Sequence, residues 1–143
     1  MKAATKIELE KGFKRTPQRL AILAFLEGNT SHPSAEEIFN AVVGKDRTLS
    51  FATVYNTLNT LSKAGALREL TIDPSRKRYD PNTGAHNHII CVDCQKVVDV
   101  PEEITINLPK EVAQNFSILG NHVEFYGICP ACRKTHKTAS PAA

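Results

Sequence analysis

The four cysteines of this chain form two matched pairs, Cys91-x2-Cys94 and Cys129-x2-Cys132, separated by 34 residues. Each pair offers two thiolates at a spacing that can bind one side of a tetrahedral ion, and two pairs complete a closed zinc site. We therefore expect structural zinc to tie the strand near residue 91 to the end of the chain. Hydrophobic residues make up 41% of the sequence, which is thin for two lobes, and a closed zinc site contributes on the order of 10 kcal/mol in small modules.

The expected compartment supports metal over disulfides. The N-terminus lacks the apolar run of a signal peptide, and no apolar stretch reaches the roughly 20 residues needed to span a bilayer. We expect a cytoplasmic protein with no membrane partner, where cysteine pairs favour metal binding. A thiol–disulfide enzyme is the alternative, but it needs a low-pKa thiolate, usually at a helix start, and Cys91 follows a strand-like run. We therefore expect no enzyme and no catalytic residues.

Most of the helix signals in the sequence lie in the first 65 residues. Three helices are predicted to begin at Thr16-Pro17, at the capping box Ser34–Glu37 and at Ser50, and to end near Gly28, Gly44 and Gly65. A further helix over residues 5–12 is weakly signalled. Two strand-like runs, 66–72 and 76–80, follow with a turn at 73–75. Three helices and a β-hairpin make a winged helix-turn-helix.

The sequence pattern changes after residue 80, from mainly helix signals to a linker followed by strand-like runs. Residues 81–85 read as a linker, and strand-like runs follow at 86–92, 96–100 and 122–128, with a helix near 108–116. We predict an α+β protein with a winged-helix DNA-binding domain at 1–80, a hinge at 81–85 and a second domain at 86–134. The small, polar residues 135–143 are expected to be a disordered tail.

The third predicted helix is a candidate DNA reader. If Val54, Leu58 and Leu61 face inward, the opposite face is polar and free of acids, and it carries Thr53, Tyr55, Asn56, Asn59, Thr60 and Lys63. Hydroxyl and amide groups of this kind bond base edges and phosphates. Phosphate contacts are expected from Lys14, Arg15 and Arg19, and the basic hairpin tip Arg76–Arg78 would flank the helix. An ordinary solvated helix face remains the alternative.

Charge and symmetry agree with a DNA partner. Residues 1–80 hold 13 Lys and Arg against 9 Asp and Glu, whereas residues 81–143 hold 5 against 6. The basic half is therefore the better candidate for a polyanion. A winged-helix module normally binds a palindrome as two copies, so we expect a homodimer on double-stranded palindromic DNA.

A second metal site is indicated by five nitrogen and oxygen donors. His86 and His88 share one face of a strand-like run, because side chains alternate along a strand, and Cys91 points to the other face. The other donors are His32, Asp80 and Asp99. If the five converge, the mixed set suits Fe(II) or Mn(II). His32 before Pro33 and Asp80 before Pro81 could instead be turn residues, and His122 is left as structural or accessory.

At this point the residues resemble the ferric uptake regulator family, from about Lys14 to Cys132. The motifs that carry the resemblance are Arg15-Thr-Pro-Gln-Arg19, His32-Pro-Ser-Ala-Glu-Glu37, Ala52-Thr-Val-Tyr-Asn-Thr-Leu58, His86-Asn-His-Ile-Ile-Cys-Val-Asp-Cys94 and Tyr126-Gly-Ile-Cys-Pro-Ala-Cys132. The resemblance implies that the second domain is an α/β dimerisation domain and that Tyr55 lies on the recognition helix. It implies structural zinc on the four cysteines and assigns the regulatory metal to His32, Asp80, His86, His88 and Asp99.

Within the family, aspartates at both Asp80 and Asp99 resemble the peroxide-responsive branch. Iron-responsive members more often have glutamates there, and they carry acids where this chain has Asn87 and Ile106. The resemblance thus implies a repressor in which Fe(II) reacts with hydrogen peroxide and a ligand histidine, His32 or His86, is oxidised. The Mn(II) form would repress without sensing peroxide. A repressor of iron uptake genes that responds to iron is the alternative.

Overall fold

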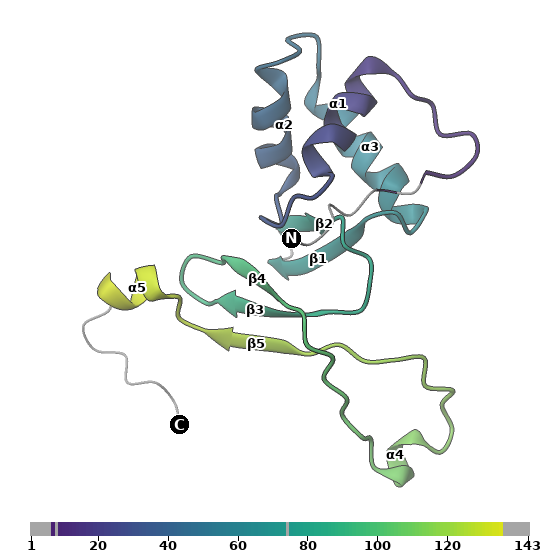
Figure 1. Ribbon diagram of the computed structural model, residues 1–143, viewed down its shortest axis with the longest axis vertical. Helices are drawn as coiled ribbons and strands as arrows, with labels where there is room; N and C mark the ends of the chain where they lie inside the picture. The colour runs from purple at the N-terminus through teal and green to yellow at the C-terminus, as the bar shows by residue number, and fades with distance from the viewer. Residues whose placement is uncertain (1–6, 8, 74, 136–143) are drawn as a thin grey trace. The chain divides into compact units, whose positions relative to one another are not determined.

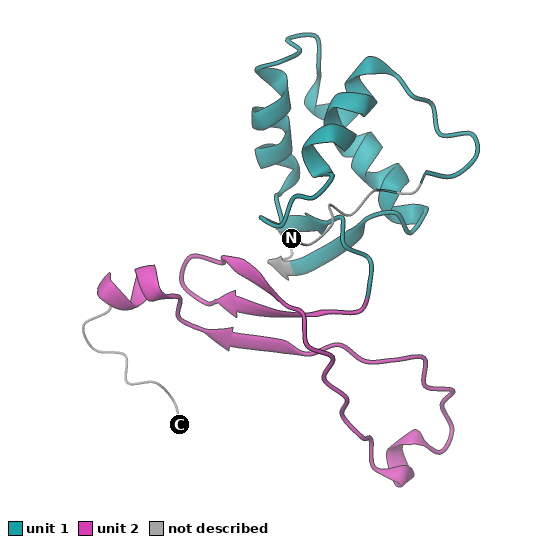
Figure 2. Ribbon diagram, viewed as in Figure 1, with its two compact units in different colours: residues 1–84 teal, residues 85–143 magenta. Residues whose placement is uncertain are grey.

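The computed structural model describes residues 7, 9–73 and 75–135, and its helices and strands are labelled in Figure 1. The chain divides into two compact units, residues 1–84 and 85–143 (Figure 2). We call them unit 1 and unit 2 and describe each by itself. The division falls inside the stretch 81–85 that the sequence predicts to be a linker.

Unit 1 contains three helices whose starts follow the predicted caps. They are α1 (Pro17–Leu26), α2 (Ala35–Val43) and α3 (Phe51–Lys63). The hydroxyl oxygens of Thr16, Ser34 and Ser50 accept hydrogen bonds from backbone N–H groups of the first turns, which otherwise lack partners. Gly65 has a φ of +74°, a left-handed conformation suited to the chain reversal after α3.

A β-hairpin completes unit 1. Strand β1 (Arg68–Asp73) pairs antiparallel with β2 (Arg76–Asp80), and Arg68 lies opposite Asp80. Pro74, in the predicted turn, lies outside the described residues. Apolar side chains from the three helices and Tyr79 of β2 form one buried core. The three helices and hairpin confirm the predicted winged-helix architecture.

Unit 2 is built on a three-stranded sheet in the order β4-β3-β5. Strand β3 (Asn87–Cys91) pairs antiparallel with β4 (Val97–Val100) and parallel with β5 (Glu124–Gly127). The six-residue helix α5 (Pro130–Thr135) follows β5. Together with unit 1 this gives the predicted α+β class.

The helix predicted near 108–116 is only one turn long, α4 (Lys110–Ala113). Its N-cap is Pro109, which makes no side-chain cap bond, and none of its residues is buried. A helix of one turn has little stability without packing, because the cost of nucleation is spread over few hydrogen bonds. The prediction was therefore wrong in length.

Other expectations concern the ends of the chain. Residues 9–12 and Ile7, the described part of the predicted helix 5–12, are not helical, and Ile7 instead contributes to the core of unit 1. Of the expected disordered tail, residues 136–143 lie outside the described residues. None of the helices in the described part of the chain has the length and apolar character to cross a membrane.

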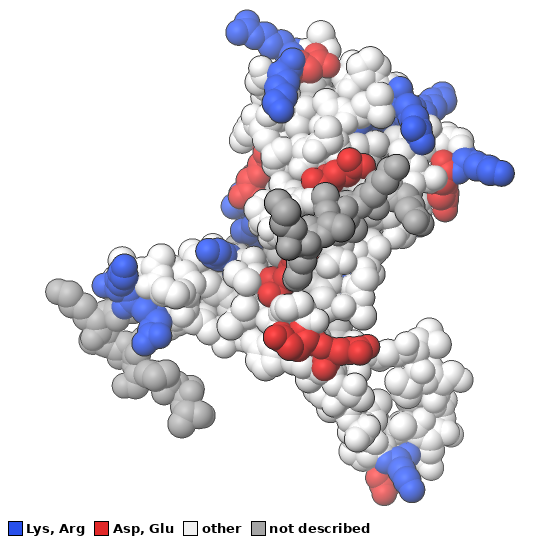
Figure 3. Space-filling model, viewed as in Figure 1, with Lys and Arg blue, Asp and Glu red and all other residues white. Residues whose placement is uncertain are grey.

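Residues 104–123 of unit 2, which we call the arm, leave the sheet and return to it (Figure 1). Its large apolar side chains are exposed: Ile106, Leu108, Val112, Phe116, Ile118 and Leu119. Its only Lys, Arg, Asp or Glu residues are Lys110 and Glu111, and Figure 3 shows the surface of the arm as mostly uncharged. An exposed apolar surface of this size is typical of a surface that a partner covers.

Candidate functional site

The four cysteines converge within unit 2. Cys91 ends β3, and Cys94 lies in the turn that follows. Because β5 runs parallel to β3 with Gly127 beside Cys91, the chain after β5 brings Cys129 and Cys132 to the same place. The four sulfur atoms lie within 4.8 Å of one another.

The spacing of these sulfur atoms fits a tetrahedral ion. The Cys94 and Cys129 sulfurs are 3.8 Å apart. Four Zn–S bonds of about 2.3 Å in a tetrahedron place neighbouring sulfurs about 3.8 Å apart. A disulfide requires about 2.05 Å, and all four cysteines are free thiols. The cluster therefore fits a structural zinc site, which the sequence predicted.

The thiols of the cluster differ in their electrostatic surroundings. Backbone N–H groups of Cys129 and Cys94 bond the Cys91 sulfur, with the Cys129 nitrogen at 3.3 Å, and they lower the pKa of Cys91 to about 6. The thiol of Cys129 raises the pKa of Cys132 to about 12. Without a metal, the site therefore favours one thiolate and disfavours another. A divalent ion reverses this for the disfavoured thiol, because a coordinating thiol is deprotonated.

The geometry also bears on the thiol–disulfide alternative. Cys129 directly precedes α5, so this CxxC pair does lie at a helix start, which the sequence analysis considered only for Cys91. However, α5 has only six residues, and all four sulfurs close on one point. A redox pair would leave the other two thiols without a role, whereas zinc uses all four.

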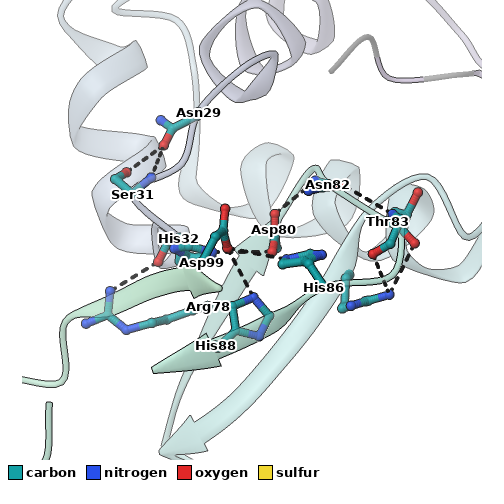
Figure 4. A network of polar contacts seen from close by, with 12 residues as sticks. Asn29, Ser31, His32, Arg78, Asp80, Asn82, Thr83, His86, His88 and Asp99 are labelled. Carbon is teal, nitrogen blue, oxygen red and sulfur yellow. Dashed lines mark hydrogen bonds and ion pairs between the residues drawn. The ribbon is translucent and has the colours of Figure 1, made fainter. Parts of the chain in front are cut away.

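In unit 1, His32 and Asp80 form a buried pair. His32 lies just before α2, and Asp80 is the last residue of β2. The His32 Nε2 is 3.3 Å from the Asp80 Oδ2, and both side chains are almost fully buried. Figure 4 shows these side chains among their polar neighbours.

The carboxylate of Asp80 serves two purposes. Its Oδ1 accepts a hydrogen bond from the backbone N–H of Asn82 at 2.9 Å, which starts the turn after β2. Its Oδ2 faces His32. The turn role and the ligand role considered from the sequence are therefore compatible, because each uses a different oxygen.

In unit 2, His86, His88 and Asp99 form a second group. The register of β3 with β4 places Asp99 opposite His88, and His86 shares the face of His88. The Nε2 atoms of both histidines are 3.3 Å from the Asp99 Oδ1 (Figure 4), and their rings meet edge to face with centroids 4.5 Å apart. Both histidines are buried.

This trio fits part of a metal site. Two imidazole nitrogens converge on one carboxylate oxygen, with donor atoms within 4.8 Å of one another. Such nitrogen and oxygen donors suit Fe(II) or Mn(II), unlike the four thiols at the other end of β3. The trio supplies three donors and the His32–Asp80 pair two, so neither group alone completes an octahedral shell.

Asn87 has a structural role that the sequence analysis missed. Its side-chain amide donates to the carbonyl of Glu102 at 2.7 Å, and its oxygen accepts from the N–H of Val123 at 2.8 Å. The buried side chain thus ties β3 to Glu102, just before the arm, and to Val123, the last residue of the arm. No local sequence signal could reveal this, because both partners are distant in the chain.

His122 lies outside both groups. Its side chain is 66% exposed, and its Nε2 is 3.7 Å from the Oε1 of Glu124. Glu124 also accepts a hydrogen bond from the Tyr126 hydroxyl at 2.8 Å. His122 therefore belongs to a small polar cluster on the surface of unit 2.

The helix α3 presents the predicted polar face. Val54, Leu58 and Leu61 are buried, whereas Tyr55 is 46% exposed. The other members of this face, Thr53, Asn56, Asn59, Thr60 and Lys63, are exposed or half-buried. Lys14 and Arg15 are exposed, whereas Arg19 lies 4.9 Å from the centroid of the Phe13 ring. The DNA contacts of these residues stay a prediction.

The three basic residues of the hairpin, which were expected to flank the recognition helix, make contacts within unit 1. Arg76 pairs with Glu37 at 3.2 Å, and Lys77 pairs with Glu69 at 3.2 Å. The Arg78 side chain is only 11% exposed and donates to the carbonyl of His32 at 3.1 Å. The three cations thus have partners within unit 1, and Arg78 does not face solvent as a phosphate contact would.

Comparison with known proteins places these groups in a family. Residues 10–126 match the profile of the ferric uptake regulator family. The chain is 38% identical over 125 residues to the peroxide-responsive repressor PerR of Staphylococcus epidermidis, covering 86% of this chain and 83% of that protein. It is 36% identical over 136 residues to the peroxide operon regulator of Bacillus subtilis, covering 94% of each.

Solved structures give the same result. The ferric uptake regulator of Francisella tularensis with iron superposes with a TM-score of 0.69 at 28% identity, covering 88% of this chain and 99% of that chain. A match over 88% of the chain extends into both units, and the range 10–126 matched by the family profile includes both His/Asp groups.

Replacing one thiol should empty the zinc site. The Cys91→Ser variant loses a buried sulfur that the cluster requires, so we expect it to lose zinc and the order of unit 2. Elemental analysis should find one zinc in the wild-type chain and none in the variant, and hydrogen exchange should show unit 2 unprotected. A variant that keeps both zinc and protection would contradict the assignment.

Asn87→Asp should destabilise unit 2. The substitution removes the donor to the Glu102 carbonyl and places a charge in a buried position, with an expected cost of about 1–3 kcal/mol. Hydrogen exchange of the β3 amides measures this loss. The control is Asn40→Asp, an exposed asparagine of α2 in unit 1, which should leave the exchange of the β3 amides as in the wild type. Equal effects of the two substitutions would show that the hydrogen bonds of the Asn87 side chain do not stabilise unit 2.

Proposed function

Because the chain belongs to the ferric uptake regulator family, we propose that it is a metal-dependent DNA-binding repressor that responds to hydrogen peroxide. The similarity to two peroxide-responsive regulators, at 36–38% identity over most of the chain, supports the peroxide response. The observation that carries the proposal is the pair of His/Asp groups, in which all three histidines are buried and both acids are aspartates.

We propose that one regulatory ion, Fe(II) or Mn(II), is bound by all five residues: His32, Asp80, His86, His88 and Asp99. Only five residues separate Asp80 from His86, so the chain can span at most about 20 Å between them. Each group is incomplete alone. All of its members except the half-buried Asp99 are buried, where ionisable side chains need a counterpart. These facts favour a single shared ion over two separate ones.

A shared ion would couple the two units. His32 and Asp80 belong to the winged-helix unit, whereas the trio belongs to unit 2. An ion bound by both would hold the units at one angle, and in a dimer it would fix the spacing between two α3 helices. Metal binding would then select the DNA-binding arrangement from a wider population.

The arm supports the homodimer. Its six exposed apolar residues include Leu119, whose side chain is 99% exposed. Burial of apolar area contributes about 25 cal/mol per Å², so a second copy that covers the arm would be strongly favoured. A two-fold dimer presents two α3 helices, and such a dimer would bind a palindromic operator in double-stranded DNA.

The peroxide response would use the ligands themselves. The five residues would hold Fe(II) beside the imidazoles, and the ion, when bound, would lend one electron to hydrogen peroxide and recover it as the imidazole is oxidised. In the net reaction, one peroxide oxygen is incorporated into His32 or His86 and the other leaves as water. An oxidised imidazole is a poorer ligand, so the units would separate and the protein would release DNA.

The His86→Ala variant tests whether the regulatory site acts independently of zinc. Its metal-dependent DNA binding should weaken by on the order of 100-fold. Mutation of a residue that only supports a metal ligand can already cost this much in metal affinity or activity, and the loss of the ligand itself should cost at least as much. Its zinc content and circular dichroism should not change, because His86 lies away from the cysteines. DNA binding is read by fluorescence anisotropy with and without Mn(II).

The matched control is Tyr55→Ala. It should weaken DNA binding while both metal affinities stay unchanged, because Tyr55 lies on α3 and contacts neither group. Loss of zinc in His86→Ala, or metal-dependent DNA binding of that variant equal to the wild type, would contradict the proposal that the zinc site and the regulatory site act independently.

A peroxide titration separates the proposed function from an iron-level sensor. Stoichiometric peroxide added to the Fe(II) form should add one oxygen to peptides containing His32 or His86 and abolish DNA binding. The Mn(II) form should be unaffected. An iron sensor would instead keep its DNA and both histidines unmodified, and mass spectrometry of the digested chain distinguishes the two outcomes.

A further inference from the structure

His32 has an unusual backbone conformation. Its φ is +52°, in the left-handed region that non-glycine residues rarely occupy. The next residue is Pro33, and a residue before proline is restricted to extended conformations. The conformation therefore costs free energy, and it persists only because the surrounding structure holds it.

Strand β2 supplies the contacts that hold this segment. The N–H of Tyr79 donates to the Pro33 carbonyl at 2.9 Å, and Ser34 forms a bridge with Arg78. The Arg78 guanidinium donates to the His32 carbonyl at 3.1 Å (Figure 4). Among these contacts, the bond from Arg78 is the one that reaches His32 itself.

Arg78 and Asp80 hold His32 at two points. The two residues are separated by one position on β2, so their side chains share a face of the strand. Arg78 bonds the backbone carbonyl, while Asp80 lies 3.3 Å from the imidazole Nε2. Together they determine both the peptide orientation and the direction of the ring.

The guanidinium is itself held in place. The Glu37 Oε2 lies 3.7 Å from the Arg78 Nη1 and accepts the N–H of Ser34 at 2.8 Å. The carboxylate thus joins Arg78 to the start of α2. Arg76 bonds the other oxygen of this carboxylate, Oε1, at 3.2 Å and donates to the Ser34 hydroxyl at 3.4 Å, whereas Arg78 donates to the His32 carbonyl.

We infer that Arg78 is a positioning residue, which fixes the left-handed backbone of His32 and thereby directs its imidazole to the regulatory metal. The inference rests on the proposed function, since it assumes that His32 is a ligand. Without the bond, His32 would relax toward an extended conformation and its ring would turn away from Asp80. His86, in unit 2, would keep its place and serves as an internal reference.

The test compares Arg78→Met with Arg76→Met. Both remove a guanidinium from β2 and from Glu37, but only the first removes the bond to His32. Mn(II) affinity, measured by electron paramagnetic resonance of the free ion, should fall about 10- to 100-fold in Arg78→Met. In the Fe(II) form with peroxide, the ratio of oxygen gained at His32 to that at His86 should fall about tenfold, because a displacement of about 1 Å is costly.

Arg76→Met should stay within about twofold of the wild type in both readouts, because the half-buried Arg76 side chain bonds Ser34 and Glu37 and lies outside the two groups of candidate ligands. Equal values for the two variants, or an unchanged ratio and affinity in Arg78→Met, would overturn the inference. If the wild type gains no oxygen at either histidine, the proposed function fails, while the Mn(II) comparison still decides the role of Arg78.

Folding is checked by circular dichroism and zinc content. Should Arg78→Met not fold, Arg78→Lys and Arg78→Gln replace it. Lysine is longer than glutamine and can still donate to the His32 carbonyl, whereas glutamine is too short to reach it. The lysine variant should therefore keep the wild-type Mn(II) affinity and the glutamine variant should lose it, and equal affinities would overturn the inference.

Discussion

Strand β3 is paired on both of its edges, and both candidate metal groups of unit 2 depend on that pairing. The antiparallel register with β4 places Asp99 opposite His88, and the parallel register with β5 brings Cys129 to Cys91. Because side chains alternate along a strand, β3 can serve the imidazole group and the thiol cluster without mixing their donors. A shift of one residue in either register would separate the ligands.

Much of this organisation is predictable from local sequence. The caps of the three helices, the paired cysteines and the alternation of His86 and His88 follow from spacing alone. The bridge of Asn87 to the arm and the return of Arg78 to His32 do not, because their partners lie 15 to 46 residues away. Helix α4 is shorter than predicted, because its apolar residues find no packing in one copy of the chain.

In the proposed function, unit 1 orients a ligand, His32, before the metal binds. The wing strand β2 holds His32 through Arg78 and ends in Asp80, whose carboxylate also starts the turn toward unit 2. The ligand geometry and the beginning of the linker therefore share one side chain. Preorganised donors reduce the ordering cost of binding, so more of the metal affinity remains to bias the arrangement of the units.

In the proposed function, donors from both units bind one ion. Pulsed electron paramagnetic resonance of the Mn(II)-loaded protein counts the imidazole nitrogens coupled to the metal. We expect three, from His32, His86 and His88, and a loss of one nitrogen in either His32→Ala or His86→Ala when Mn(II) is bound in excess. A spectrum with two nitrogens that His32→Ala leaves unchanged would contradict it, because the ion would then belong to unit 2 alone.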